Sequence, residues 1–252
     1  MITSNLMGGL GNYMFQISAA ISLAEKNNDK AVFNFDGAKR IHRNINLYKD
    51  NILRKVKIGN FNVNHTYKEP EFIYNEIPYH KNMLLDGYFQ SEKYFDEKVV
   101  RELFSIDEIT NSYIDEEYGS LLENKTVSVH VRRGDYLPRI GRHPVCGMSY
   151  YNKSFEYFDD DNLFLIFSDD IEWCKNNFKG NNFVFIENEP DYIDLYLMSL
   201  CKDNIICNST FSWWGAWLNT NENKKVISPK IWFGEKKRLN TKDLYCKGWK
   251  II

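Results

Sequence analysis

The sequence contains no long apolar run, since none approaches the roughly 18 consecutive apolar residues that a membrane-spanning helix requires. It also opens without a basic and then apolar leader, which predicts a soluble, cytoplasmic protein and leaves open peripheral contact with a membrane. Cysteine is scarce: the five cysteines are an odd number and none forms a CxxC pair, so neither a disulfide framework nor a zinc site is expected. We expect reduced thiols that mostly pack in the core.

An excess of charge of one sign is also missing. Lysine and arginine number 32 and aspartate and glutamate 34, for a net charge of -2. The chain therefore has no global field for nucleic acid, and any anion site must be local. Aromatic residues make up 15% and charged residues 26% of 252 residues, which is typical of a folded globular protein with a sizeable core.

Residues 126–136, TVSVHVRRGDY, form the segment around which we expect the fold to be organised. Three valines alternate with Ser128, His130 and Arg132, a period of two that predicts a half-buried strand. Because side chains of a strand alternate between its faces, His130 and Arg132 point to one side and Arg133 to the other. This places a cationic fork where open α/β sheets bind ligands. An ordinary edge strand with solvated charge is the alternative.

The start of the chain predicts a second element that can face a ligand. A short strand at residues 2–6 leads into the glycine-rich turn 7–12, MGGLGN, and then into a helix over residues 13–26. In such a unit, backbone N–H groups and a helix N-terminus can face an anion. The glycines do not match GxGxxG, so an ordinary tight turn is an equal alternative.

The rest of the chain mostly alternates between strand and helix patterns, which predicts a parallel, doubly wound α/β sheet. Residues 36–76 are rich in Asn, Lys and Arg and have weak periodicity, and residues 124–125 mark a boundary between two halves. Strands are expected at residues 31–35, 57–63, 83–89, 163–167, 183–186 and 205–206, and helices at residues 94–103, 109–122, 149–158, 171–178 and 191–201.

Polar residues follow three of the predicted strands, at residues 130–135, 168–170 and 208–212. The carboxyl ends of parallel strands share one edge of a sheet, so these clusters are expected to meet in one crevice. Guanidinium groups match phosphate oxygens bidentately, and hydroxyl groups that open a helix add neutral donors. The pattern predicts a nucleotide or nucleotide-sugar site, to which a loop over residues 137–148 adds positive charge.

Three neighbouring patterns have simpler structural explanations. The hydroxyl residues within 209–212 can act as plain helix caps. The tryptophans of residues 213–217 are expected to fill a helix–sheet interface. Three aspartates at residues 159–161 invite a magnesium or manganese site, but they precede the strand 163–167 and so lie at its amino end, where a solvated turn is expected.

Several motifs resemble those of family 11 glycosyltransferases, the α-1,2-fucosyltransferases. They are GGLGNYMFQ, HVRRGDY, FSDDIEWCK and NSTFSWWGAWL, and the resemblance extends to the tail DLYCKGWKII. The combination of HxRRxD with NSTFSWW is specific. One departure is Tyr13, which stands where the family usually has glutamine.

The resemblance implies a GT-B architecture, in which two Rossmann-like, doubly wound α/β halves face a cleft. It assigns residues 1–123, with the turn 7–12, to an acceptor-side half and residues 124–252 to a half that binds GDP-fucose. It implies inverting transfer of L-fucose from GDP-β-L-fucose to the 2-hydroxyl of a terminal β-galactoside, without a metal or another cofactor. The expected partners are GDP-fucose and a galactoside-terminated oligosaccharide, and nucleic acid is not expected.

The same resemblance assigns roles to individual residues. Arg132 would bind the diphosphate, His130 and Asp194 the guanosine, and residues 209–212 the phosphates. The turn at residues 8–12 would approach the sugar from the other half.

The general base is assigned on position alone. Asp135 is the nearest carboxylate that the motif supplies, and its competing role is to hold Arg132 or Arg133 in place. The expected catalytic residues are Arg132, Asp135 and Asn12. The expected donor-binding residues are Gly9, Gly11, Asn12, His130, Arg132, Arg133, Ser168, Asp169, Asp194, Ser209, Thr210, Phe211 and Ser212.

The chemistry of the residues agrees with this interpretation. Departure of GDP places growing negative charge on the β-phosphate, so a fixed cation there stabilises the transition state more than the ground state. A non-catalytic nucleotide-sugar-binding module would keep the same residues, and turnover of the donor separates the two. A nucleic-acid-binding protein would need a broad basic face, against which the net charge argues.

Overall fold

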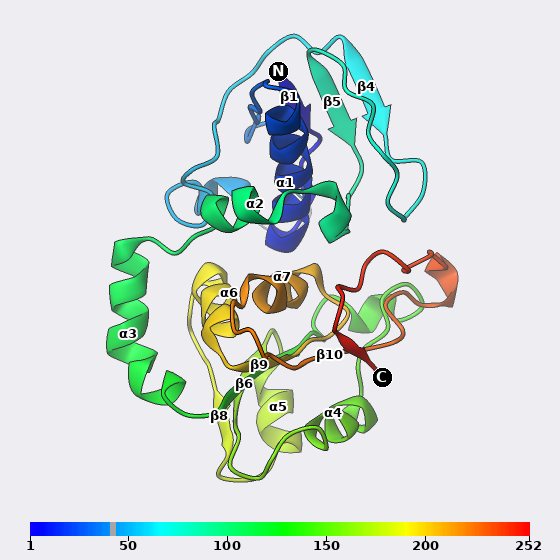
Figure 1. The fold of residues 1–252 in the computed structure, drawn as a ribbon. Coiled ribbons are helices and arrows are strands. Elements are labelled where there is room, and N and C mark those ends of the chain that lie inside the picture. Colours follow the sequence, from blue (N-terminus) through cyan, green and yellow to red (C-terminus); the bar gives the residue numbers. More distant parts are fainter. Residues whose placement is uncertain (41–43) are drawn as a thin grey trace. The chain divides into compact units, whose positions relative to one another are not determined.

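The computed structural model describes residues 1–40 and 44–252, and the chain forms two compact units (Figure 1). The first unit consists of Met1–Ile106 together with Asn240–Cys246. The second consists of Asp107–Leu239 together with Lys247–Ile252. The chain therefore returns to the first unit near its end, a crossing that the sequence analysis did not include.

The division falls before helix α3 (Glu108–Leu122), rather than at residues 123–124. This helix belongs to the second unit because it packs against α6 (Asp191–Leu200). The hydroxyl groups of Tyr113 and Tyr118 on α3 both donate to one carboxylate oxygen of Glu189, each at 2.7 Å, and tie α3 to the segment that leads into α6.

The first unit is built on a parallel three-stranded sheet in the order β1-β5-β4. Its strands are β1 (Ile2–Ser4), β5 (Met83–Asp86) and β4 (His65–Lys68). A separate short pair joins β2 (Met7–Gly8) to β3 (Lys39–Arg40), and the long, largely buried helix α1 (Leu10–Lys26) packs against β1. The remaining helices are η1 (Ile45–Tyr48), η2 (Glu92–Tyr94) and α2 (Glu97–Leu103).

Two strands that the sequence predicts in this unit are not formed. Within residues 57–63 only Ile58 forms a bridge, to Phe33, and the true strand is β4, which follows. Gly59, Asn60 and Asn62 interrupt that stretch and favour turns over strands, so the alternating apolar residues misled the prediction. Residues 31–35 likewise form isolated bridges at Ala31 and Phe33 in place of a strand.

The second unit contains a parallel six-stranded sheet in the order β11-β10-β9-β6-β7-β8, as the doubly wound prediction requires. Its strands are β6 (Thr126–Val131), β7 (Leu163–Ser168), β8 (Phe183–Phe185), β9 (Asp203–Ile205), β10 (Val226–Ser228) and β11 (Lys250–Ile251). The last two strands were not predicted. In Figure 1, α4 (Met148–Phe155) and α5 (Ile171–Asn177) lie on one side of the sheet, and α6 and α7 (Thr210–Leu218) on the other.

Strand β6 lies near the middle of this sheet, and all six of its residues are buried. The expectation of a half-buried strand is therefore wrong, although the period of two is kept. Its valines join a core with Tyr151 of α4 and Cys174 of α5. On the opposite face the side chain of Ser128 accepts a hydrogen bond from Asn204, and the ring of His130 packs against Phe211. Helices on both faces hide the polar side of the strand as well as the apolar side.

The helices predicted in both units are present, with ends that differ by a few residues. Trp213, Trp214 and Trp217 of α7 are buried, which confirms their role in the core. The five cysteines are free thiols, and all but Cys146 are buried, also as expected. Residues 137–147 form a loop that contains the 3-10 helix η3 (Leu137–Arg139), and η4 (Glu235–Lys237) lies in the loop after β10.

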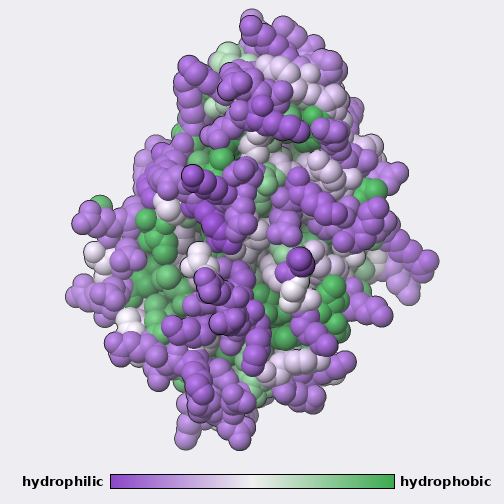
Figure 2. Space-filling model, viewed as in Figure 1, coloured by the Kyte–Doolittle hydropathy of each residue, from purple (hydrophilic) through white to green (hydrophobic). Residues whose placement is uncertain are grey.

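The surface seen in Figure 2 is mostly hydrophilic, with hydrophobic areas scattered between charged side chains. Across residues 1–40 and 44–252, no helix is both long enough and apolar enough to cross a membrane.

Candidate active site

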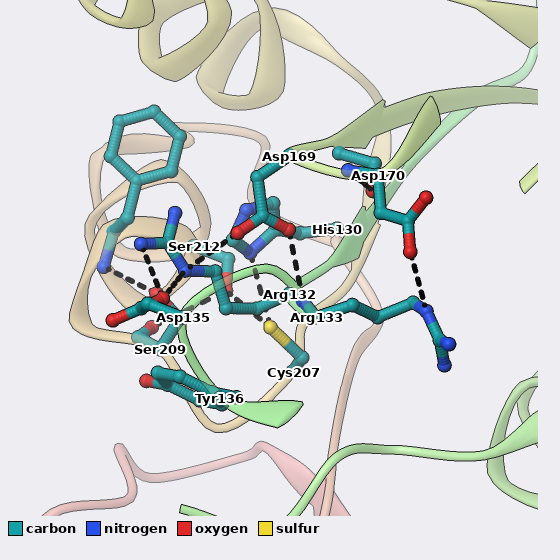
Figure 3. Close-up of polar contacts among 12 residues, drawn as sticks. His130, Arg132, Arg133, Asp135, Tyr136, Asp169, Asp170, Cys207, Ser209 and Ser212 are labelled. Atoms are coloured by element: carbon teal, nitrogen blue, oxygen red, sulfur yellow. Dashed lines mark hydrogen bonds and ion pairs between the residues drawn. The ribbon is translucent and has the colours of Figure 1, made fainter. Parts of the chain in front are cut away.

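Strands β9, β6 and β7 are neighbours in the sheet, and the polar segments that follow them meet at one edge (Figure 3). Arg132, just after β6, contacts Asp169, just after β7. His130, near the end of β6, contacts Cys207 after β9. The expected meeting of three strand ends is therefore observed within the second unit.

Two carboxylates hold the guanidinium group of Arg132. Oδ1 of Asp135 lies 2.9 Å from Nε and 2.7 Å from Nη2, and Oδ2 of Asp169 lies 3.2 Å from Nε. Burial lowers the pKa of Arg132, but Asp169 and Asp135 outweigh burial and the net shift is upward. These contacts use the Nε side of the group, so Nη1 is the part that can meet an anionic ligand.

Asp169 links the ends of β6 and β7 through both of its oxygens. While Oδ2 pairs with Arg132, Oδ1 accepts the backbone N–H of Arg133 at 2.9 Å. Gly134 makes this approach possible, because a Cβ atom at that position would lie 2.7 Å from Oδ2 of Asp169. The glycine of the HVRRGDY motif is therefore needed for close contact with the carboxylate that orients the arginine.

Arg133 points away from Arg132, as the alternation of a strand predicts (Figure 3). Its Nε lies 3.0 Å from Oδ2 of Asp170, and its guanidinium carbon lies 4.0 Å from the centre of the Trp173 ring. Asp170 also caps α5 by accepting the N–H of Trp173 at 3.3 Å. The structure thus packs the Arg133 side chain against α5 and does not bring its guanidinium to the side that Arg132 faces.

His130 is buried and neutral. Its Nδ1 lies 3.1 Å from Sγ of Cys207, and its carbonyl accepts the hydroxyl of Tyr151 at 3.1 Å. Burial, with a smaller contribution from Arg132, lowers the pKa of His130 to about 3, and burial raises the pKa of Cys207 well above its ordinary value. The neutral ring carries one N–H donor and one acceptor nitrogen, and the tautomer decides which of the two faces the thiol.

Helix α7 begins at the same edge of the sheet. Ser209 is its N-cap and accepts the N–H of Phe211 at 3.3 Å, while the hydroxyl of Ser212 donates to the carbonyl of Ser209 at 3.3 Å. Both serines therefore have capping roles in the chain itself, and Thr210 is half-buried at the first helical position. The positive end of the helix dipole adds to the attraction for an anion.

The loop over residues 137–148 is anchored beside this edge. The hydroxyl of Tyr136 donates to the carbonyl of Asn208 at 3.0 Å, and Asn208 donates to the carbonyl of Pro144 at 2.8 Å. The ring of His143 stacks on Tyr136 at 4.9 Å between centres. Burial, followed by the charge of Lys237, lowers the pKa of His143.

The remaining residues expected after β7 and β8 have local contacts. The hydroxyl of Ser168 accepts the N–H of Asp170 at 2.9 Å and shapes the turn into α5. Asp194 is half-buried in the first turn of α6. Helix α6 packs against α3, on which burial and then the hydrogen bond to Glu189 raise the pKa of Tyr118.

In the first unit, the glycine-rich turn is tightly built. Gly8 has φ +96°, and a Cβ atom there would lie 2.2 Å from Nδ2 of Asn12, so both the conformation and the space require glycine. Gly9 is the N-cap of α1 and contributes no side-chain bond, and Gly11 lies buried in the first turn. The side chain of Gln16 on α1 accepts the N–H of Met7 at 3.0 Å and ties the start of the turn to the helix.

Gln90 is a candidate residue that the sequence analysis missed. Its amide donates to Oδ1 of Asn12 at 2.8 Å, and its own Oε1 is buried without a hydrogen-bond partner among the described residues. Phe89, which precedes it, has φ +52° and is fully buried, so the backbone turns sharply to place Gln90 beside Asn12. The available signal was a polar residue just after a predicted strand, at residues 83–89.

The aspartates at residues 159–161 lie in the turn before β7, as expected. Asp161 forms an exposed ion pair with Lys125 at 2.6 Å. Over the described part of the chain, no group of three or more His, Cys, Asp or Glu residues is arranged to hold a metal ion.

A family model described as "Glycosyl transferase family 11" matches residues 1–252. The chain belongs to this family. It is therefore a glycosyltransferase, as the motifs indicated.

Two relatives from Escherichia coli match nearly the whole chain. The "O-antigen biosynthesis glycosyltransferase WbnK" is 35% identical over 91% of this chain and 94% of its own length. The "Alpha-1,2-colitosyltransferase" is 32% identical over 98% of this chain and 97% of its own length. The rabbit "Galactoside alpha-(1,2)-fucosyltransferase 2" is 24% identical over 86% of this chain and 67% of its own length.

Solved structures of fucosyltransferases share the fold. NodZ from Bradyrhizobium superposes with a TM-score of 0.56 at 13% identity, covering 85% of this chain and 91% of that chain. POFUT1 in complex with GDP-fucose gives a TM-score of 0.53 at 9% identity, covering 88% and 94%. The likeness shows a GT-B-like fold for this member of family 11, which confirms the predicted fold class.

Proposed function

We propose that this chain transfers L-fucose from GDP-β-L-fucose to the 2-hydroxyl of a terminal β-galactoside in a glycan, with inversion and without a metal ion. The observation that carries the proposal is the guanidinium group of Arg132, fixed by Asp135 and Asp169 at the carboxyl edge of the sheet in a family 11 glycosyltransferase. The rabbit relative is named as a galactoside α-(1,2)-fucosyltransferase, which supports the acceptor and the linkage.

In the proposed reaction, the acceptor 2-oxygen forms a bond to the anomeric carbon as the bond from that carbon to the β-phosphate oxygen breaks. The electron pair of the broken bond moves to the phosphate, so negative charge grows there. Nη1 of Arg132 and the start of α7 would meet this charge, and the two carboxylates fix the guanidinium before the reaction begins. Attack opposite the leaving group turns a β-linked donor into an α-linked product.

The proton of the acceptor hydroxyl must also leave. Asp135 is the carboxylate first considered for this step, but in the ligand-free chain it pairs with Arg132 through both Nε and Nη2. We therefore propose that Asp135 positions the arginine. When the donor bond is largely broken in the transition state, little help from a base is required, and the proton passes to water or to the departing diphosphate as the new bond forms.

Recognition of guanosine is assigned to His130 and Asp194. A carboxylate can accept from N1–H and the exocyclic amino group of guanine together, and the neutral His130 ring has one N–H donor and one acceptor nitrogen. For the first unit we propose that Asn12, held by Gln90 in the glycine-rich turn, contributes to binding of the sugar.

GDP-colitose is a second candidate donor, because the colitosyltransferase relative matches nearly the whole chain. Colitose is L-fucose without its 3-hydroxyl. A site that hydrogen-bonds this hydroxyl would reject the deoxy sugar by about 10⁴-fold, whereas a site that packs against carbon would accept both donors with a difference of about 10- to 200-fold.

The proposal is tested by incubating the full chain with GDP-fucose or GDP-colitose and a panel of β-galactosides, and by measuring release of GDP and formation of product. We expect turnover that depends on the galactoside, with GDP-fucose preferred. Preference for GDP-colitose would support the second donor. Binding of GDP-sugars without turnover on any galactoside would support a non-catalytic module and contradict the proposal.

A further inference from the structure

Two loops of the second unit lie side by side next to the candidate site. They are residues 137–143 and residues 229–239, and the second is the orange to red segment in Figure 1. The N–H of Gly234 donates to the carbonyl of Arg142 at 3.0 Å, and the N–H of Lys236 donates to the carbonyl of Gly141 at 2.9 Å. These bonds join the loops into one surface, which we call the basic-aliphatic surface.

Both loops expose large aliphatic side chains. The relative exposures are 46% for Leu137, 59% for Ile140, 64% for Ile231 and 38% for Leu239. Single exposed aliphatic residues are common on protein surfaces, but four within two hydrogen-bonded loops are not scattered. Trp232, which lies between Ile231 and Leu239 in the sequence, is buried, and its carbonyl accepts a hydrogen bond from Asn208 at 3.1 Å. This contact anchors the loop that carries Ile231.

The same two loops carry a strong local excess of positive charge. Their cations are Arg139, Arg142, Lys230, Lys236, Lys237 and Arg238, against a single acidic residue, Glu235. The chain as a whole has a net charge of -2, so this excess is local. Apart from Lys237, which is half-buried over the ring of Phe233 at 4.5 Å, these cations are exposed.

We propose that the basic-aliphatic surface docks the protein on a membrane that contains anionic lipids. Aliphatic side chains can enter the boundary between head groups and acyl chains, while neighbouring lysines and arginines stay with the phosphates. A soluble polyanion would use the cations and leave the aliphatic residues exposed to water. A partner protein with an acidic face is the other occupant that the charge allows, and vesicle binding by variants separates these cases.

The surface adjoins the candidate site through the chain itself. The N–H of Arg139 donates to the carbonyl of Tyr136 at 2.8 Å, and Tyr136 directly follows Asp135. Docking would therefore hold this edge of the sheet close to the lipid head groups. If the proposed function holds, an acceptor glycan anchored in that membrane would reach the site without leaving the surface.

Binding should follow the physics of a charged interface. Each lysine or arginine near an anionic surface strengthens binding by about fivefold, and added salt weakens the attraction. The full chain is mixed with vesicles of phosphatidylcholine alone or with added phosphatidylglycerol and then sedimented. We expect binding to the anionic vesicles that falls as salt is raised, and little binding to the neutral ones.

Two double variants separate the contributions. Ile140→Ser with Ile231→Ser should reduce vesicle binding by at least about tenfold, because these two aliphatic side chains no longer enter the lipid boundary. Lys236→Gln with Arg238→Gln should reduce it by about 25-fold. The matched controls are Ile109→Ser, at a side chain 84% exposed on α3, and Lys81→Gln with Lys98→Gln in the first unit, and both should bind as the parent does.

Several results would overturn the proposal. They are equal binding to neutral and anionic vesicles, no binding to either, or binding that survives the aliphatic double variant and depends on the cations alone, as expected for a soluble polyanion site. The proposal would also be overturned if the parent chain formed a complex with an acidic protein and did not bind vesicles. Turnover on a soluble galactoside, measured without vesicles, should be unchanged in the aliphatic variant and reports on the proposed function separately.

Discussion

Nε of Arg132 lies 3.2 Å from Oδ2 of Asp169, an ion pair that joins the ends of the neighbouring parallel strands β6 and β7. With Asp135 on the same side of the guanidinium, the arginine is held in one orientation before any ligand arrives. A fixed cation loses little entropy when it meets an anionic ligand, which is the basis of the role in catalysis that we propose for Arg132.

The first prediction concerns this arginine. Arg132→Lys should lower kcat/KM by 10²- to 10³-fold, or about 3 to 4 kcal/mol in the transition state, because a lysine cannot keep the fork between two carboxylates and a phosphate. Arg132→Ala should lose more. Steady-state kinetics with GDP-fucose measures both. Arg101→Lys, which alters an i,i+4 ion pair with Glu97 on α2, is the matched control and should retain activity.

The second prediction separates two roles of Asp135. If it positions Arg132, Asp135→Asn should weaken GDP binding and slow turnover together, because a neutral amide no longer anchors the guanidinium. Titration calorimetry with GDP and measurement of kcat give the two numbers. Unchanged GDP affinity with a large loss of kcat would assign the general base to Asp135 instead. Asp161→Asn, at the exposed pair with Lys125, serves as the control.

The third prediction is selectivity for guanine. GDP should inhibit far better than UDP or ADP, because a carboxylate that accepts from the N1–H and the amino group of guanine loses these donors with the other bases. A buried acceptor without a donor costs about 1 to 3 kcal/mol. Asp194→Ala should reduce the difference in inhibition between GDP and the other two nucleotides. Equal inhibition by the three nucleotides in the parent chain would remove the case for a guanosine site at Asp194.

The fourth prediction follows from the buried imidazole of His130. Its pKa is about 3 in the folded chain against an ordinary 6.5, so between these values the unfolded chain binds a proton that the folded chain does not. The free energy of unfolding should therefore fall as the pH drops through this window, by up to about 1.4 kcal/mol per pH unit from this residue. Urea unfolding at several pH values measures it. His130→Gln should show a shallower slope, and an identical slope would contradict the assignment.

Much of the site in the second unit could be predicted because its residues follow strands with clear apolar patterns. Once β6, β7 and β9 were recognised, the rule for parallel sheets was enough to bring residues 130–135, 168–170 and 208–212 to one edge. The apolar periodicity of the strands does not predict which carboxylate forms an ion pair with which arginine. The pairing of Arg133 with Asp170 and Trp173 depends on the twist of the sheet and on where α5 begins.

The first unit was harder to predict, for a different physical reason. Its strands are only two to four residues long, so their pairing is decided by contacts far along the chain more than by local pattern. The contact of Gln90 with Asn12 spans most of this unit in sequence and depends on the left-handed backbone at Phe89. The return of residues 240–246 to the first unit has no local signal, although Asp243 is fixed there by Lys93 at 2.6 Å.

The most direct test of the account is the structure of the product formed in excess EDTA. GDP-β-L-fucose and a β-galactoside are incubated with the full chain, and the linkage and the anomeric configuration are read by NMR. The account predicts an α-1,2-linked fucosyl galactoside formed at an undiminished rate, because Arg132 supplies the charge that the phosphate needs. Activity that EDTA abolishes and Mn²⁺ restores, or a β-linked product, would contradict it.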